Sequence, residues 1–229
     1  KQEVLLTKWA NEKNATKLKV FFEESTAKIV DKIKGNSTSF VLHMGRDTRS
    51  HSKALSDLLL EGASSFMDCV REAFPSLVAS IRDHGVLTTP MLHHIVLHSN
   101  PSYLPDYIEP KTSRKGYIET YAGAYVDLLK GMESADSIPL RIDGACGVGY
   151  KAAHEIFEEI TSVAGDAKPT PLLVHNGEND GPLNDSCGSE HVQKQLSPPT
   201  WYTSKEELEF SYCCSLDGDA DRIVFFGQS

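Results

Sequence analysis

Short apolar runs recur along this chain, and most are followed by a polar turn and then by a segment with helical spacing. The runs typical of strands cover 39–44, 77–81, 140–143, 171–175, 212–216 and 223–226. The segments with helical spacing cover 4–34, 52–63, 91–97, 118–129, 152–160 and a short stretch near 192. Because strand, turn and helix in this order form the unit of α/β domains, the alternation predicts an α/β fold.

The charge balance argues against a general nucleic-acid binder. The chain has 229 residues, with 23 Lys and Arg against 32 Asp and Glu, which gives a formal net charge of −9. Phosphate contacts along a nucleic acid need clustered basic residues, so we expect no such partner. No apolar run approaches the roughly 20 residues of a membrane-spanning helix, so we expect no membrane partner either.

The cysteines do not form the pattern of a disulfide framework. Their number is odd, and the set is Cys69, Cys146, Cys187, Cys213 and Cys214. The wide spacing, the adjacent pair and the absence of C-x-x-C favour a reducing compartment. The first residues also lack an apolar leader with a small-residue cleavage site, so we expect a cytoplasmic protein.

The predicted helices carry recognisable start and stop residues. Ser52 is suited to capping one helix, Thr89 to capping the next with Pro90 in its first turn, and Gly131 to ending a third. The apolar positions expected to share one face of the first of these helices are Leu55, Leu58, Leu59 and Ala63.

Two local patterns allow both a structural and a functional interpretation. His94 and His98 have the i,i+4 spacing of metal ligands, but H-E-x-x-H is absent, so ordinary helix histidines are favoured. The turn 144–149 is rich in glycine and leads from a strand into a helix, where backbone amides can hold phosphate. Its G-x-x-G-x-G spacing differs from the dinucleotide fingerprint, which favours close packing of strand and helix.

The strongest chemical signal is an acidic loop between the last two apolar runs. Asp217, Asp219 and Asp221 alternate with small residues, and Arg222 follows. Three carboxylates this close repel one another unless a cation neutralises them, and Mg²⁺ prefers such oxygen ligands. The arginine adds a permanent cation whose planar fork suits phosphate. The loop therefore predicts a divalent-metal site that acts on phosphate.

Other interpretations of this loop agree less well with its amino-acid sequence. An EF-hand needs glycine at the sixth position and glutamate at the twelfth, where this chain has Arg222 and Gln228. A phosphatase with an aspartate nucleophile usually has Thr or Val at the fifth position of D-x-D-x-T/V, where Asp221 stands. A solvated acidic hairpin loop is the remaining alternative, although surface carboxylates seldom sit between two apolar strands.

The acidic loop resembles the metal-binding loop of the α-D-phosphohexomutases, and its wider C-C-S-L-D-G-D-A-D-R-I-V context resembles the phosphoacetylglucosamine mutases among them. Further segments are similar to that family's motifs in the same order along the chain. They are G-R-D-T-R at 45–49, G-V-L-T-T-P-M-L-H at 85–93, D-G-A-C-G-V-G at 143–149 and L-N-D-S-C-G-S at 183–189. At 146, cysteine replaces the asparagine of the family pattern.

The resemblance implies an intramolecular phosphotransferase that interconverts N-acetylglucosamine 6-phosphate and N-acetylglucosamine 1-phosphate, on the way to UDP-N-acetylglucosamine. In that family a phosphoserine donates its phosphoryl group and a bisphosphorylated sugar is the intermediate. Carried onto this chain, Asp217, Asp219 and Asp221 would bind Mg²⁺, and Arg222 would orient phosphate. The implied partner is an amino-sugar phosphate, and the implied fold is a series of α/β domains with mixed sheets and flanking helices.

Two motifs of the family have no counterpart in these residues. They are the T-A-S-H-N-P loop that carries the serine and the R-x-S-G-T phosphate clamp. Ser50-His51 directly follows Arg49 and lacks the Asn-Pro, so we interpret it as the start of a helix. We therefore expect an internal fragment, incomplete at both ends, with the later part of a first domain at 1–108, a second domain at 109–206 and the start of a third at 207–229.

Two other functions stay open at this stage. The chain could come from a mutase for another hexose phosphate, because none of the quoted motifs is a visible sugar contact. It could also be a noncatalytic protein that binds Mg²⁺ or a sugar phosphate. Whether the chain comes from a phosphoacetylglucosamine mutase or from another hexose-phosphate mutase, we expect the 229 residues alone to be inactive.

Overall fold

The structure is a computed structural model that describes residues 20, 24, 27–28, 39–73, 75–105, 110–131, 138–167, 169–202 and 212–227. The chain divides into two compact units. The first comprises Lys1–Leu42 and Asp57–Arg82, and the second comprises His43–Ser56 and Asp83–Ser229. Most of the helical pattern expected over 4–34 lies outside the described residues. The domain boundaries expected from the sequence stay a prediction.

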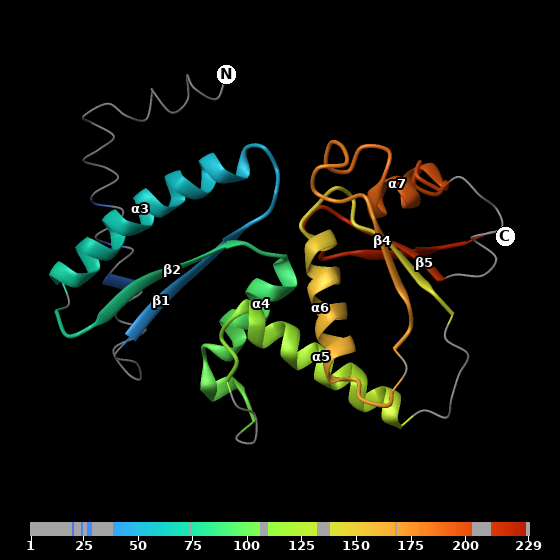
Figure 1. Cartoon of the computed structure of the whole chain (residues 1–229). Coiled ribbons are helices and arrows are strands. Elements are labelled where there is room, and N and C mark those ends of the chain that lie inside the picture. The colour runs from blue at the N-terminus through green and yellow to red at the C-terminus, as the bar shows by residue number, and fades with distance from the viewer. Residues whose placement is uncertain are drawn as a thin grey trace. The chain divides into compact units, whose positions relative to one another are not determined.

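From residue 39 onward, the described chain begins with two strands and one long helix (Figure 1). Strand β1 (Ser39–Arg46) pairs with β2 (Val78–Val86) in a two-stranded sheet, and helix α3 (Ser52–Ala73) connects them. In the first unit Met67 and Val70 of α3 pack with Ala79 of β2. Burial of these apolar side chains holds the helix against the strands.

The apolar face predicted for α3 is not covered at its leucines. Leu55, Leu58 and Leu59 are more than half exposed, whereas Ala63 is buried. Helical periodicity defines which residues share a face but not which turns a neighbouring element covers. Among the described residues, the strand residue Ala79 covers the later turns of α3, at Met67 and Val70.

Three helices pack together in the second unit. They are α4 (Thr89–His98), α5 (Arg114–Lys130) and α6 (Gly149–Val163), and a short 3₁₀ turn, η1 (Pro101–Tyr103), follows α4. Ala122 and Val126 of α5 form a buried cluster with Ile160 of α6. Gly131 ends α5 as expected.

The N-cap of α4 differs from the sequence prediction by one residue. Thr88, not Thr89, precedes the helix, and its hydroxyl accepts a hydrogen bond from the Met91 amide at 3.2 Å. Thr89 is the first helical residue, and its hydroxyl is engaged elsewhere. Pro90 lies in the first turn, as predicted.

The histidines of α4 have structural contacts. The rings of His94 and His98 stack with centroids 3.9 Å apart. A ring nitrogen of His94 lies 3.1 Å from the Lys111 carbonyl oxygen, and the Lys111 amide donates to Nδ1 of His98 at 3.0 Å. Both imidazoles therefore tie α4 to the segment that leads into α5, and the structure favours the interpretation as ordinary helix histidines.

A four-stranded mixed sheet forms the other part of the second unit. Its strand order is β4-β3-β5-β6, with β3 (Leu140–Asp143), β4 (Leu172–His175), β5 (Tyr212–Leu216) and β6 (Ile223–Phe226). β3 is parallel to both β4 and β5, and β6 is antiparallel to β5. Helix α7 (Gly188–Gln195) precedes β5. The expected α/β fold with a mixed sheet and flanking helices is confirmed.

The parallel strands bring three chain connections to one edge of this sheet. Asp143 is level with His175 on one side and with Ser215 on the other, at the carboxyl ends of the strands. Ligand sites in α/β sheets commonly lie at this edge. None of the helices in the described part of the chain combines the length and the apolar composition that crossing a bilayer requires.

Candidate metal centre

The loop between β5 and β6 brings the three predicted carboxylates together. Asp217, Asp219 and Asp221 each offer one ligand oxygen, and these atoms all lie within 4.8 Å of one another. The positive φ of 57° at Ala220 helps turn the backbone so that alternate side chains converge. The geometry expected from the alternating pattern is therefore present.

Asp217 is buried and already well satisfied. Its Oδ1 accepts hydrogen bonds from the backbone amides of Asp221 at 3.1 Å and Arg222 at 3.2 Å, and its Oδ2 accepts one from Nε of Arg222 at 2.8 Å. Burial by itself would raise the pKa of Asp217, but the hydrogen bonds from Arg222 outweigh it and lower that pKa. The carboxylate therefore stays ionised at neutral pH.

Asp221 shows the opposite electrostatic behaviour. Desolvation by its neighbours, followed by the nearby carboxylates of Asp217 and Asp219, raises its pKa above the ordinary value. The cluster thus carries negative charge that Arg222 does not fully offset. A divalent cation would relieve this repulsion.

Arg222 lies beside the cluster and is half exposed. Its Nε is 2.8 Å from Oδ2 of Asp217 and 3.7 Å from Oδ1 of Asp221. Its hydrogen bond to Asp217 raises the pKa of the guanidinium, which keeps the charge permanent. Asp217 fixes one edge of the planar group and thereby aims it beside the acidic loop.

The glycine-rich turn before α6 packs directly against the acidic loop. The Val148 amide donates to the Gly218 carbonyl at 3.2 Å. A Cβ on Gly147 would lie 2.5 Å from that same oxygen, closer than real Cβ atoms approach. A Cβ on Gly149 would likewise lie 2.7 Å from the Leu216 side chain and 3.0 Å from that of Ala220. The interpretation of this turn as a close-packing element, favoured by its spacing, agrees with these contacts.

Asp219 is held by Thr89, which the sequence suggested as a helix cap. The Thr89 hydroxyl donates to Oδ2 of Asp219 at 3.0 Å, and the Thr89 amide donates to the Asp219 carbonyl at 3.1 Å. These residues also border a small cavity of about 110 Å³ that Arg46 and Asp47 line from the G-R-D-T-R turn. The structure therefore places two of the quoted motifs beside the acidic loop.

The G-R-D-T-R turn is itself fixed by one carboxylate. Asp47 accepts hydrogen bonds from the Arg49 amide at 3.1 Å, from the Arg49 guanidinium and from the Ser52 hydroxyl. The Leu55 amide donates to the His51 carbonyl, so Ser50-His51 forms the turn into α3. The interpretation of Ser50 as part of a helix start fits this geometry.

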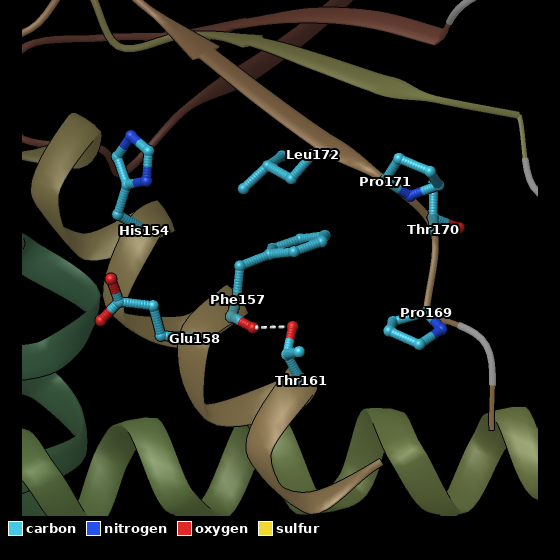
Figure 2. A pocket seen from close by; sticks show the side chains of 8 residues that line it. All are labelled: His154, Phe157, Glu158, Thr161, Pro169, Thr170, Pro171 and Leu172. Atoms are coloured by element: carbon cyan, nitrogen blue, oxygen red, sulfur yellow. Dashed lines mark hydrogen bonds between the residues drawn. The ribbon is translucent and has the colours of Figure 1, made fainter. Parts of the chain in front are cut away.

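A larger groove lies away from the acidic loop, on the far part of α6. Figure 2 shows its lining by α6 side chains, among them His154 and Glu158, and by the segment 169–172, which leads into β4. Its volume is about 500 Å³. Among the described residues that line it there is no acidic-loop residue and no group of three metal-ligating side chains.

The donor set of the acidic loop fits a hard divalent cation. Three carboxylates within 4.8 Å offer oxygen only, which matches the ligand preference of Mg²⁺ rather than that of soft metals. Their neighbours Thr89 and Arg222 supply hydrogen bonds to the carboxylates, as residues around metal ligands commonly do. The acidic cluster can therefore bind a metal ion.

The chain is similar over most of its length to a group of sugar-phosphate mutases. It is 35% identical over 185 residues to phosphoacetylglucosamine mutase 2 of Schizosaccharomyces pombe, covering 80% of this chain and 30% of that protein. It is 31% identical over 225 residues to phosphoacetylglucosamine mutase of Saccharomyces cerevisiae, covering 93% of this chain and 38% of that protein. The chain belongs to the phosphoacetylglucosamine mutase family. No family model matches it.

Solved phosphoacetylglucosamine mutases share the fold. The Aspergillus fumigatus N-acetylphosphoglucosamine mutase in complex with glucose 1,6-bisphosphate superimposes with a TM-score of 0.66 at 26% identity, covering 88% of this chain and 34% of that one. The same enzyme in complex with GlcNAc-6P and magnesium gives 0.59 at 25% identity, covering 82% and 34%. The family resemblance expected from the motifs is confirmed, and the chain spans about a third of the relatives it matches.

Proposed function

We propose that this chain supplies the metal-binding part of a phosphoacetylglucosamine mutase. The activity would be the interconversion of N-acetylglucosamine 6-phosphate and N-acetylglucosamine 1-phosphate, through a phosphoserine enzyme and a bisphosphorylated sugar, in the synthesis of UDP-N-acetylglucosamine. The observation that carries the proposal is the convergence of three carboxylate oxygens within 4.8 Å in a chain of this family. A related structure that holds both GlcNAc-6P and magnesium supports it.

The side chains of the acidic loop have separate tasks in this proposal. Asp217, Asp219 and Asp221 would hold Mg²⁺. When bound, the metal would neutralise charge on the oxygens of the transferring phosphoryl group, which can be worth several kcal/mol. Asp217 keeps the Arg222 guanidinium in place through Nε, and Arg222 would orient phosphate through its remaining donors.

Positioning is the main task that the protein performs in phosphoryl transfer. The Gly147–Gly218 approach and the Val148 amide fix the loop from the α6 side. Thr89 fixes it from the α4 side. Asp47 and Arg46, which line the same small cavity as Asp219, would form part of the wall that the sugar phosphate meets.

A direct binding experiment tests the metal assignment on this chain. Titration calorimetry with Mg²⁺, and with Mn²⁺ as a second probe, should reveal one site that Asp219→Asn weakens at least tenfold. Asp166→Asn is the matched control, because Asp166 is exposed and lies beyond α6, outside the loop. Absence of binding to the unaltered chain would remove the basis of the proposal.

A turnover experiment tests the activity. The chain alone should not convert either N-acetylglucosamine phosphate in a coupled assay, because it has no counterpart of the family's serine loop or phosphate clamp. A chimera that carries this chain in place of the matching segment of the Saccharomyces cerevisiae relative should convert them, and Asp219→Asn in that chimera should abolish most of the activity. Preference for glucose or mannose phosphates would instead indicate another hexose-phosphate mutase, and metal binding in an inactive chimera would favour a noncatalytic protein.

A further inference from the structure

We propose that Thr89 is a positioning residue of the metal centre, whose hydroxyl fixes the orientation of the Asp219 carboxylate and thereby strengthens binding of the divalent cation. The inference rests on the proposed function, because it assigns Asp219 as a metal ligand. It adds a residue from α4, 130 positions earlier in the chain, to a site that the sequence confined to one loop.

Thr89 contacts Asp219 twice. Its hydroxyl donates to Oδ2 at 3.0 Å, and its backbone amide donates to the carbonyl oxygen of the same residue at 3.1 Å. The two bonds together define both the position of the Asp219 backbone and the rotation of its carboxylate. A single flexible surface contact would do neither.

The start of α4 is built so that this hydroxyl is available. Thr88 provides the cap, because its own hydroxyl accepts from the Met91 amide. Thr89 therefore does not cap the helix, although its residue type would suit that role. Pro90 follows in the first turn with its fixed φ. Two adjacent threonines thus have two different tasks, and only the second one reaches the acidic loop.

The type of donor matters for metal binding. The Thr89 hydroxyl is neutral, so it restricts the Asp219 carboxylate without cancelling its charge. Asp217 has the opposite arrangement, because the Arg222 cation occupies its Oδ2. A ligand oriented by a neutral donor keeps its full attraction for a cation, and loss of such a neighbouring group typically costs 10- to 100-fold in metal affinity.

Three variants of the 229-residue chain separate this role from a purely structural one. Thr89→Val keeps the shape and removes the hydroxyl, and we expect it to weaken Mn²⁺ and Mg²⁺ binding about tenfold in calorimetry. Thr89→Ser restores the donor and should recover most of the affinity. Thr88→Val removes the helix cap, and we expect it to lower the thermal midpoint while changing metal affinity less than twofold.

The outcomes are distinct. Equal metal affinity of Thr89→Val and the unaltered chain would overturn the inference while leaving the metal site intact. Equal weakening by Thr88→Val and Thr89→Val would also overturn it, because stability of the helix start would then explain the effect. If Thr89→Val fails to fold by circular dichroism, the comparison between Thr89→Ser and Thr89→Ala decides, and the alanine variant should be the weaker binder. Failure of the unaltered chain to bind either cation would instead count against the proposed function.

Discussion

Ser215 donates a hydrogen bond from its hydroxyl to Oδ2 of Asp143 at 2.7 Å, and both side chains are fully buried. The two residues are level with each other on the parallel strands β3 and β5. Asp143 also accepts from the Gly188 amide at 2.6 Å, the Asn176 side chain at 2.8 Å and the Ala145 amide at 3.0 Å. One carboxylate therefore joins the turns after β3 and β4, the start of α7, and the strand that ends just before Asp217.

Replacing this carboxylate should destabilise the second unit. In Asp143→Asn one acceptor becomes a donor that faces the Gly188 amide, so buried hydrogen bonds are lost and a donor is left unsatisfied. We expect a loss of about 3 kcal/mol in the free energy of unfolding, measured by urea denaturation. Asp180→Asn is the control, because Asp180 is exposed and accepts a local turn bond from the Gly177 amide. Similar midpoints for the two variants would contradict the role of Asp143.

The contact between the two glycine turns gives a second prediction. Gly147→Ala would place a methyl group 2.5 Å from the Gly218 carbonyl oxygen, so the acidic loop must shift. We expect a loss of about 2 kcal/mol in stability together with weaker Mg²⁺ binding. Gly123→Ala, within α5, has no atom within 4 Å of the new methyl and should raise stability by about 0.5–1 kcal/mol. Thermal melts and calorimetry on both variants provide the comparison.

Local sequence was sufficient to locate several elements because their signals are local. The alternating apolar and polar residues 140–143 lie between Pro139 and Gly144, and β3 occupies 140–143. The acidic loop was visible for the same reason, since its three carboxylates alternate within five residues (217–221) between two apolar runs. By contrast β1 extends beyond its predicted run to Arg46, and β2 extends through the polar residues 82–84 to Val86. Backbone pairing extends a strand irrespective of the polarity of its side chains.

The parts of the site that sequence could not predict depend on distant residues. Thr88 and Thr89 both suit a helix cap, and the choice between them is decided by Asp219. Asp143 stood in a quoted motif, but its hydrogen-bonding role depends on Ser215 and on turns that the sheet topology brings together. Of these long-range contacts, only the close approach of Gly147 and Gly218 left a signal in the sequence, because both turns carry the glycine that permits it.

The imidazole of His94 should make stability depend on pH. Burial, and then the neighbouring His98, lowers the pKa of His94 from its ordinary value of 6.5. The unfolded chain therefore binds the proton more readily than the folded chain. The contribution of neutral His94 to stability is complete above about pH 6.5 and is lost as pH falls from there towards the lower pKa of the folded state. We expect His94→Gln to show a smaller fall in urea midpoint than the unaltered chain between pH 7.5 and pH 5.5. The exposed neighbour variant His93→Gln serves as control, and identical profiles for all three proteins would contradict the prediction.

The buried thiols should resist alkylation in the folded protein. Burial raises the pKa of Cys187 to about 12 and that of Cys214 to about 12, so only ~10⁻⁴ of each is thiolate at pH 8. Both side chains are also shielded from solvent. We expect iodoacetamide at pH 8 to leave them unmodified in the native chain and to modify both in 8 M urea, as read by peptide mass spectrometry. Rapid native labelling of Cys187 would mean that the start of α7 opens readily. The hydrogen bond from the Gly188 amide to Asp143 argues against such opening.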